Sequence, residues 1–169
     1  QVTTDGRGNY SLSVPKSDTY QVSLTKNGYF KAVQTFSHHE LKARKGTIGD
    51  ITLVGKVKER VMLAFAGDVM MGRRYYKPYF GDPILINEQT VLKDSKAIVE
   101  HIKPYMALAD YAAVNLETQL AEQEPSTKAK KSVVFYSKPQ ILSALEWAGV
   151  DYVSLGNNHT YDYLDSGLA

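Results

Sequence analysis

The sequence predicts an α/β fold built on βαβ units, preceded by a small all-β sandwich module. Short segments of alternating polarity fill the first part of the chain, whereas near-continuous apolar runs alternate with helical segments after it. Polar residues directly follow those apolar runs. We therefore divide the chain into a β module over residues 1–55, a charged linker over 56–60 and an α/β region over 61–169.

Turn-forming residues separate the short segments of the β module. These segments span residues 10–14, 20–24, 31–36 and 48–54. Glycine and asparagine in DGRGN (residues 5–9) and at Asn27-Gly28 mark tight turns between them. Alternation with a period of two is typical of half-buried strands, so residues 1–55 predict a small antiparallel sandwich.

Two stretches in this module carry a family resemblance. TTDGRGNYSLSVP and YQVSLTKNGY resemble the carboxypeptidase regulatory-like or prealbumin-like modules of secreted bacterial proteins. The resemblance implies an accessory β module, and we expect a further strand before Gln1 to complete it.

Apolar runs of strand length alternate with helical segments after residue 60. The runs span 61–66, 111–114 and 150–155, and the helical segments span 90–109 and 138–148. Pro139 near the start of the second helix and Gly149 after its end are typical helix boundary residues. This order predicts a right-handed parallel sheet, and the near-continuous apolarity predicts strands covered on both faces.

Composition excludes several classes of protein. A chain of 169 residues with 43% hydrophobic residues can bury a core, so it is not of the disordered class. A net charge of +2, without basic residues interleaved with aromatic ones, argues against a nucleic-acid partner. The absence of cysteine excludes disulfides and thiolate metal sites. No apolar run approaches the ~20 residues of a membrane span.

Two groups of charged or titratable residues are interpreted as solvent-exposed loops. Lys128, Lys130 and Lys131 lie in a stretch rich in Glu, Pro, Ser and Thr. His38 and His39 lack further ligands at a suitable spacing for a metal site.

Polar residues follow each predicted strand of the α/β region. Asp68 follows the first strand, Asn115 and Glu117 the second, and Asn158 and His159 the third. Ligands of open α/β sheets bind beyond the carboxyl ends of the strands, so these side chains are expected to converge. Their oxygen and nitrogen donors suit Mn²⁺, Mg²⁺, Fe²⁺ or Zn²⁺. Two such ions bridged by a carboxylate would activate water for hydrolysis.

These motifs resemble a known family. FAGDVMMGR, ADYAAVNLET and AGVDYVSLGNNHTYDY are similar to the CapA/PgsA-type poly-γ-glutamate capsule biosynthesis proteins, a branch of the calcineurin-like metallophosphoesterase superfamily. The resemblance implies that Asp68 is a metal ligand and Glu117 a bridging carboxylate. It implies an amide ligand in Asn158, with Asn115 as a ligand or a supporting residue. His159 would contact a phosphoryl oxygen or protonate the leaving group.

The resemblance extends to residues around these motifs, with one departure. Arg73 and Arg74 are placed to bind an anionic substrate. Asp162, with Tyr161, would orient the ring of His159. Met70 stands where the superfamily has a histidine, which argues against ordinary coordination of the first metal.

Each assignment has a purely structural alternative. Asp68 could be a polar turn residue, and the Asn157-Asn158 pair could cap a following helix. Glu117 could be an exposed cap, and Arg73 and Arg74 could be a solvated pair. Coincidence at three successive strand ends favours the functional interpretation.

The superfamily completes its site with later histidines, including a Gly-His-x-His segment that this chain lacks. We therefore expect the sequence to be the N-terminal portion of a longer protein, with an incomplete metallophosphoesterase-like domain that is inactive alone.

The resemblance leaves three functional hypotheses. In the first, the whole protein acts in synthesis, export or attachment of an anionic extracellular polymer such as poly-γ-glutamate, as a metal-dependent hydrolase. In the second, it binds the polymer or a membrane biosynthetic complex without catalysis. In the third, it is a structural, self-assembling envelope protein. An extracellular or cell-envelope location in a bacterium is implied by resemblance alone.

Overall fold

The computed structural model describes residues 1–168, which fall into two compact units, Gln1–Lys56 and Val57–Ala169. Ala169, the last residue of the predicted α/β region, lies outside the described residues.

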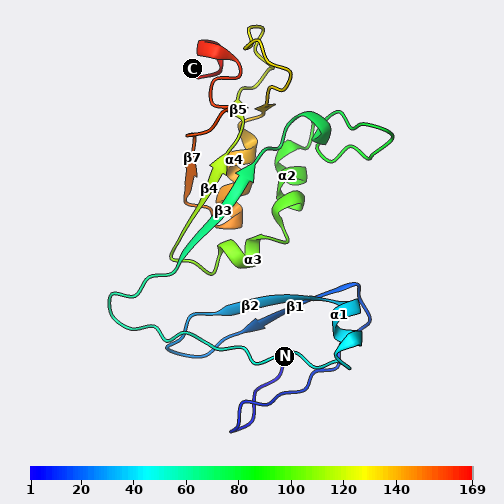
Figure 1. Cartoon of the computed structure of the whole chain (residues 1–169), viewed down its shortest axis with the longest axis vertical. Coiled ribbons are helices and arrows are strands. Elements are labelled where there is room, and N and C mark those ends of the chain that lie inside the picture. The colour runs from blue at the N-terminus through cyan, green and yellow to red at the C-terminus, as the bar shows by residue number, and fades with distance from the viewer. Residues whose placement is uncertain (169) are drawn as a thin grey trace. The chain divides into compact units, whose positions relative to one another are not determined.

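An antiparallel hairpin forms the centre of the N-terminal unit (Figure 1). Strand β1 (Thr19–Leu24) pairs with β2 (Ala32–Ser37), and helix α1 (His38–Ala43) follows directly. Gly28 has a φ of 77°, which favours glycine, in the turn between the strands. Phe30, Val33 and Phe36 are the buried apolar side chains of this unit.

The predicted sandwich is not confirmed. Residues 10–14 form no strand in the described structure. Residues 48–54 form no strand either, although they contribute a contact. That contact is the hydrogen bond from the Phe30 N–H to the Val54 carbonyl, at 2.8 Å. The expected loop at His38 and His39 is wrong, because both residues begin α1. A capping box between Ser37 and Glu40 stabilises the start of that helix.

A parallel sheet with the strand order β3-β4-β7 lies within residues 57–168 (Figure 1). The strands are β3 (Leu63–Val69), β4 (Tyr111–Leu116) and β7 (Tyr152–Ser154). Helices α2 (Val91–Val99) and α3 (Lys103–Met106) connect β3 to β4, and α4 (Gln140–Ala148) lies between β4 and β7. The predicted alternation of strands and helices is thus confirmed.

Two helices replace the single helix predicted over 90–109. Pro104 occupies the first turn of α3, where its missing N–H costs no hydrogen bond. Gly149 ends α4 with a φ of 92°, as the sequence suggested. No helix within residues 1–168 is long and apolar enough to cross a membrane.

Shorter elements complete the unit. Strands β5 (Gln119–Leu120) and β6 (Tyr136–Ser137) form a small parallel pair. A 3₁₀ turn over Arg73–Tyr75 follows β3, and another over Leu164–Gly167 lies near the end of the described chain.

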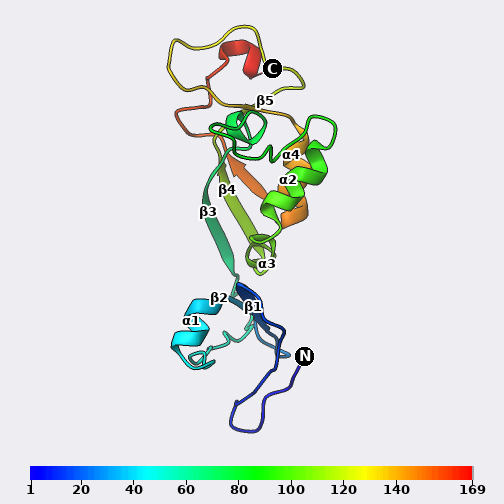
Figure 2. The same ribbon diagram turned by 90° about the vertical axis from the view of Figure 1, so that its right-hand side faces the viewer.

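The two faces of the sheet differ in how they are covered. Helices α2 and α4 pack on one face (Figure 2), where Val114 and Leu116 join the core with Ile141 and Leu145 of α4. The opposite face carries exposed apolar side chains, from Leu63, Phe65, Tyr111 and Tyr152. The prediction of two covered faces is wrong for residues 57–168, because no segment of this unit packs on the second face.

Candidate functional site at the carboxyl ends of the strands

The register of the parallel sheet aligns polar residues from neighbouring strands. Asp68 of β3 is the partner of Asn115 of β4, and Asn115 is the partner of Ser154 of β7. A register shift in β3 between Phe65 and Asp68 brings this alignment about. Residues distant in sequence therefore meet at one edge of the sheet.

An amide network, which we define as Asp68, Asn115 and Asn157, crosses this edge. The Asn115 Nδ2 donates to Asp68 Oδ1 at 2.6 Å, and the Asn157 Nδ2 donates to Asn115 Oδ1 at 3.0 Å. Asn157 also donates to the Leu116 carbonyl at 2.9 Å and accepts from the His159 N–H at 2.9 Å. Both ends of the Asn115 amide are thus engaged, which orients it between the two other members.

His159 lies beside this network and is buried, at 6% exposure of the residue. Its Nδ1 is 2.6 Å from Asp162 Oδ2, and Asp162 is fully buried. A carboxylate at this distance accepts the Nδ1–H and sets the tautomer. The opposite nitrogen, Nε2, lies 3.9 Å from Glu117 Oε1.

Two groups besides His159 hold the Asp162 carboxylate. Lys131 forms an ion pair with Oδ1, and the Phe135 N–H donates to Oδ2 at 2.5 Å. Burial alone raises the pKa of Asp162, but the hydrogen bonds from Lys131, His159 and the Phe135 N–H outweigh it and lower the pKa below its ordinary value. The carboxylate is therefore charged at neutral pH.

Phe135 also touches the imidazole directly. Its ring stacks on that of His159, with centroids 4.0 Å apart and planes inclined by 27°. We call Lys131, Phe135, His159 and Asp162 the histidine cluster. It fixes His159 through one ring nitrogen and one ring face.

Some predicted site residues stay outside both groups. Asn158 is exposed, and its carbonyl accepts from Lys131 Nζ at 2.8 Å. Arg73 and Arg74 are exposed; the Arg73 guanidinium donates to the Tyr79 hydroxyl at 2.9 Å and lies 5.8 Å from the centre of the Phe135 ring. The Met70 sulfur accepts from the Gly72 N–H at 3.1 Å and is thus engaged with its own loop.

Sequence reasoning missed Asn157, Lys131 and Phe135. The doubled asparagine before His159 was a visible signal, but the sequence does not say which amide faces the strands. Lys131 and Phe135 had no local signal, because their contacts with Asp162 span 31 and 27 residues of chain.

The described residues do not by themselves form a metal site. Within residues 1–168, no three His, Asp or Glu side chains come close enough to hold an ion. The donors that do approach one another form pairs, Asp68 with Asn115 and Glu117 with His159. These groups could supply part of a ligand set of oxygen and nitrogen atoms.

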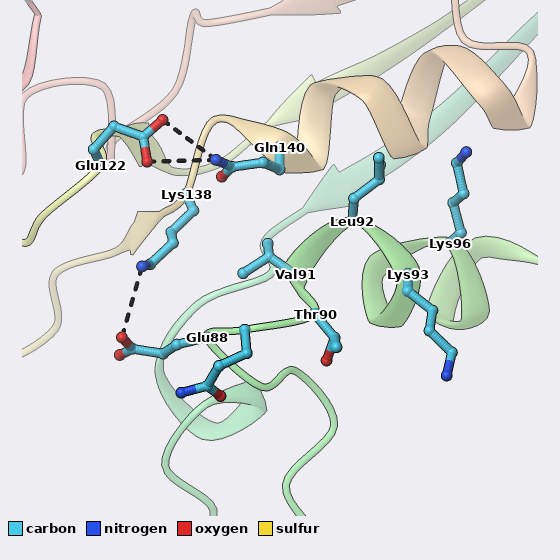
Figure 3. Close-up of a pocket in the computed structure, with 10 residues that line it drawn as sticks. Glu88, Thr90, Val91, Leu92, Lys93, Lys96, Glu122, Lys138 and Gln140 are labelled. Atoms are coloured by element: carbon cyan, nitrogen blue, oxygen red, sulfur yellow. Dashed lines mark hydrogen bonds and ion pairs between the residues drawn. The ribbon is translucent and has the colours of Figure 1, made fainter.

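A separate groove of about 750 Å³ lies where α2 and α4 begin (Figure 3). Lys138 reaches Glu88 at 3.6 Å across it, and the Gln140 amide donates to Glu122. Since the groove contains none of the predicted site residues, the strand-end groups remain the candidate site.

Comparison with known proteins identifies the family of the α/β region. Residues 62–169 match the family model described as bacterial capsule synthesis protein PGA_cap. The capsule biosynthesis protein CapA of Bacillus anthracis is 27% identical over 107 residues, which are 62% of this chain and 23% of that protein. The chain thus spans about a quarter of that relative. Because the family model covers well over half of its residues, the chain belongs to the bacterial capsule synthesis protein family PGA_cap.

Proposed function

We propose that the whole protein acts in the synthesis, export or attachment of an anionic capsule polymer of the poly-γ-glutamate type. Membership of the capsule synthesis family supports this proposal, and so does the similarity to a capsule biosynthesis protein. The comparisons support a role in capsule biosynthesis. The identity of the polymer and the chemical step are our proposals.

The observation that carries a chemical role is the fixed imidazole of His159. Its Nδ1–H is committed to Asp162 at 2.6 Å, so proton exchange is left to Nε2. Nε2 lies on the same side as Glu117, at the edge that also carries Asp68. An imidazole held in this way accepts a proton at Nε2 and can then donate that proton to an oxygen of a phosphoester or amide substrate.

A divalent ion, Mn²⁺, Zn²⁺, Fe²⁺ or Mg²⁺, belongs to this proposal for the whole protein. Asp68, Asn115, Glu117 and Asn158 would supply oxygen ligands, and the remaining ligands would come from outside residues 1–168. Residues 1–168 alone do not complete such a site. Arg73 and Arg74 would bind the anionic substrate from the surface.

Capsule yield tests the proposal in a capsule-producing bacterium that carries the full-length gene. We expect His159→Ala to abolish the surface polymer while the protein remains at its normal level. His101→Ala, which removes an exposed imidazole, is the matched control and should leave the polymer unchanged. Full capsule in the His159→Ala strain would refute a chemical role for this site.

A second candidate function is polymer binding without catalysis. Met70 favours it, because the thioether stands at the superfamily's histidine position and is engaged by the Gly72 N–H. In this case the full-length protein should bind poly-γ-glutamate equally well with and without a chelator, and also as the His159→Ala variant. Binding that a chelator abolishes would exclude it.

We also propose that residues 1–55 form an accessory module of an envelope or extracellular protein, which contacts the biosynthetic membrane complex or further copies of itself. The resemblance of its two β segments to secreted modules supports this. Fractionation of cells expressing the full-length protein tests the location, and recovery in the cytoplasm would contradict it.

A further inference from the structure

The polar stretch between β5 and β6, predicted as a solvated loop, is bonded to the histidine motif. The Ala129 N–H donates to the Asp162 carbonyl at 2.8 Å, and the hydroxyls of Thr127 and Ser166 are 2.6 Å apart. The Tyr163 hydroxyl donates to Glu124 at 2.9 Å. Several points of the stretch are therefore attached to residues 158–166.

Lys131 joins both ends of the turn that carries His159. Its Nζ donates to the Asn158 carbonyl at 2.8 Å and pairs with the Asp162 carboxylate. Asn158 precedes the histidine and Asp162 follows it, so one ammonium group links the two sides of the turn. The side chain is 32% exposed, whereas its acidic partner is fully buried.

Phe135 supplies the second constraint. Its N–H donates to the same Asp162 oxygen that receives the His159 Nδ1–H, and its ring stacks on the imidazole. The neighbouring strand β6 lies close to the loop that follows β3. A Cβ built at Gly72 in this loop would lie 2.3 Å from the Tyr136 carbonyl oxygen. The stacked Phe135 ring thus limits the rotation of the His159 ring.

We propose that Lys131 and Phe135 are positioning residues that keep His159 as its Nδ1–H tautomer with Nε2 toward Glu117. Lys131 acts through the Asp162 carboxylate, and Phe135 acts through that carboxylate and through the ring face. The value of this arrangement for catalysis rests on the proposed function, but the arrangement itself is a property of the described chain.

Nitrogen-15 NMR of the histidine rings in the 169-residue chain tests the proposal, at a pH where the rings are neutral. In the wild type, the His159 signal should report a proton on Nδ1. Lys131→Met keeps the aliphatic stem but removes the charge, and it should give a mixture of tautomers. Phe135→Leu should abolish the ring-current shift of the His159 ring protons. Lys128→Met, at an exposed position of the same stretch, is the matched control and should leave these signals unchanged.

Wild-type His159 signals in a folded Lys131→Met variant would overturn the role of Lys131. Lys131→Arg restores a cation and should return the wild-type tautomer; a mixture in this variant would also count against the proposal. If Phe135→Leu unfolds the chain, Phe135→Tyr, which keeps the stacked ring, should show wild-type signals, and shifted ones would overturn the role of the ring.

This readout requires no substrate, so it separates the inference from the proposed function. If His159→Ala leaves the capsule intact, the proposed chemistry fails while the tautomer result stands. If the chemistry holds, Lys131→Met should lower capsule yield several-fold in cells carrying the full-length gene, and Lys131→Arg should restore it.

Discussion

The amide network and the histidine cluster adjoin each other but are built differently. Asp68 is exposed at the end of a strand, and its contact with Asn115 joins paired strand positions. Asp162 is fully buried, and its contacts come from a stretch far away in the sequence. The amide network thus lies at the exposed edge of the sheet, whereas the histidine cluster is part of the packed fold.

Solvation explains the contrast. An exposed carboxylate keeps its water and needs few protein partners, so Asp68 is available to a ligand. A buried carboxylate must be paired and hydrogen-bonded, because transferring a charge out of water is costly. Asp162 has such partners in Lys131, His159 and Phe135. Changes at Asp162 should therefore affect stability, and changes in Asp68 should affect function alone.

The largest expected effect comes from Asp162→Ala. Removal of the buried acceptor leaves the His159 Nδ1–H and the Phe135 N–H without a partner and removes the ion pair of Lys131, which should cost about 3 kcal/mol in the free energy of unfolding. Urea denaturation measures this change. The control, Asp82→Ala at an exposed position, should stay within about 0.5 kcal/mol of the wild type. Equal free energies of unfolding for the two variants would mean that Asp162 is no more important for stability than an exposed carboxylate.

The second-largest effect is expected from acid, which should weaken the histidine cluster. The pKa of Asp162 in the folded chain is lowered from the ordinary value of 3.8. Its charge therefore stabilises the fold above that ordinary value, and this stabilisation is lost as the pH falls through the lower folded-state pKa. The free energy of unfolding should fall more steeply with acid in the wild type than in Asp162→Asn. Parallel curves would contradict this assignment.

Asn157→Ala should have an intermediate effect. The half-buried amide donates to Asn115 and to the Leu116 carbonyl, so its loss should cost about 1 kcal/mol. Thermal unfolding compares it with Asn158→Ala, which removes an exposed amide but keeps the carbonyl that Lys131 contacts. A larger loss for Asn158→Ala would mean that the two amides exchange roles.

The smallest stability effect is expected for Asp68→Asn. The new amide oxygen can still accept from Asn115, so the free energy of unfolding should change by less than about 0.5 kcal/mol. Capsule yield from the full-length gene should nevertheless fall strongly if Asp68 acts as the charged ligand that we propose, because its charge is lost from the sheet edge. Normal yield would assign Asp68 to a structural turn.

The sequence predicted the α/β region better than the N-terminal unit. Long apolar runs separated by helical segments carry a strong periodic signal, and the parallel sheet followed from it. Short alternating segments carry a weaker one, because a strand also needs a partner, and residues 10–14 find none in the described chain. Helix α1 was missed although Ser37 and Glu40 are spaced as a capping box.

The residues of the candidate site also differ in how well the sequence predicted them. By itself, the sequence determined that Asp68, Asn115, Glu117 and His159 lie near the carboxyl ends of successive strands, because local patterning sets roughly where each strand ends. The strands extend further than predicted, so that Asp68 lies within β3 and Asn115 within β4. Tertiary structure decided that Asn157 is the amide facing Asn115, and that Lys131 and Phe135 hold Asp162 and His159. Those contacts arise when distant segments pack around a buried charge, and the energy that selects them exists only once water has been excluded.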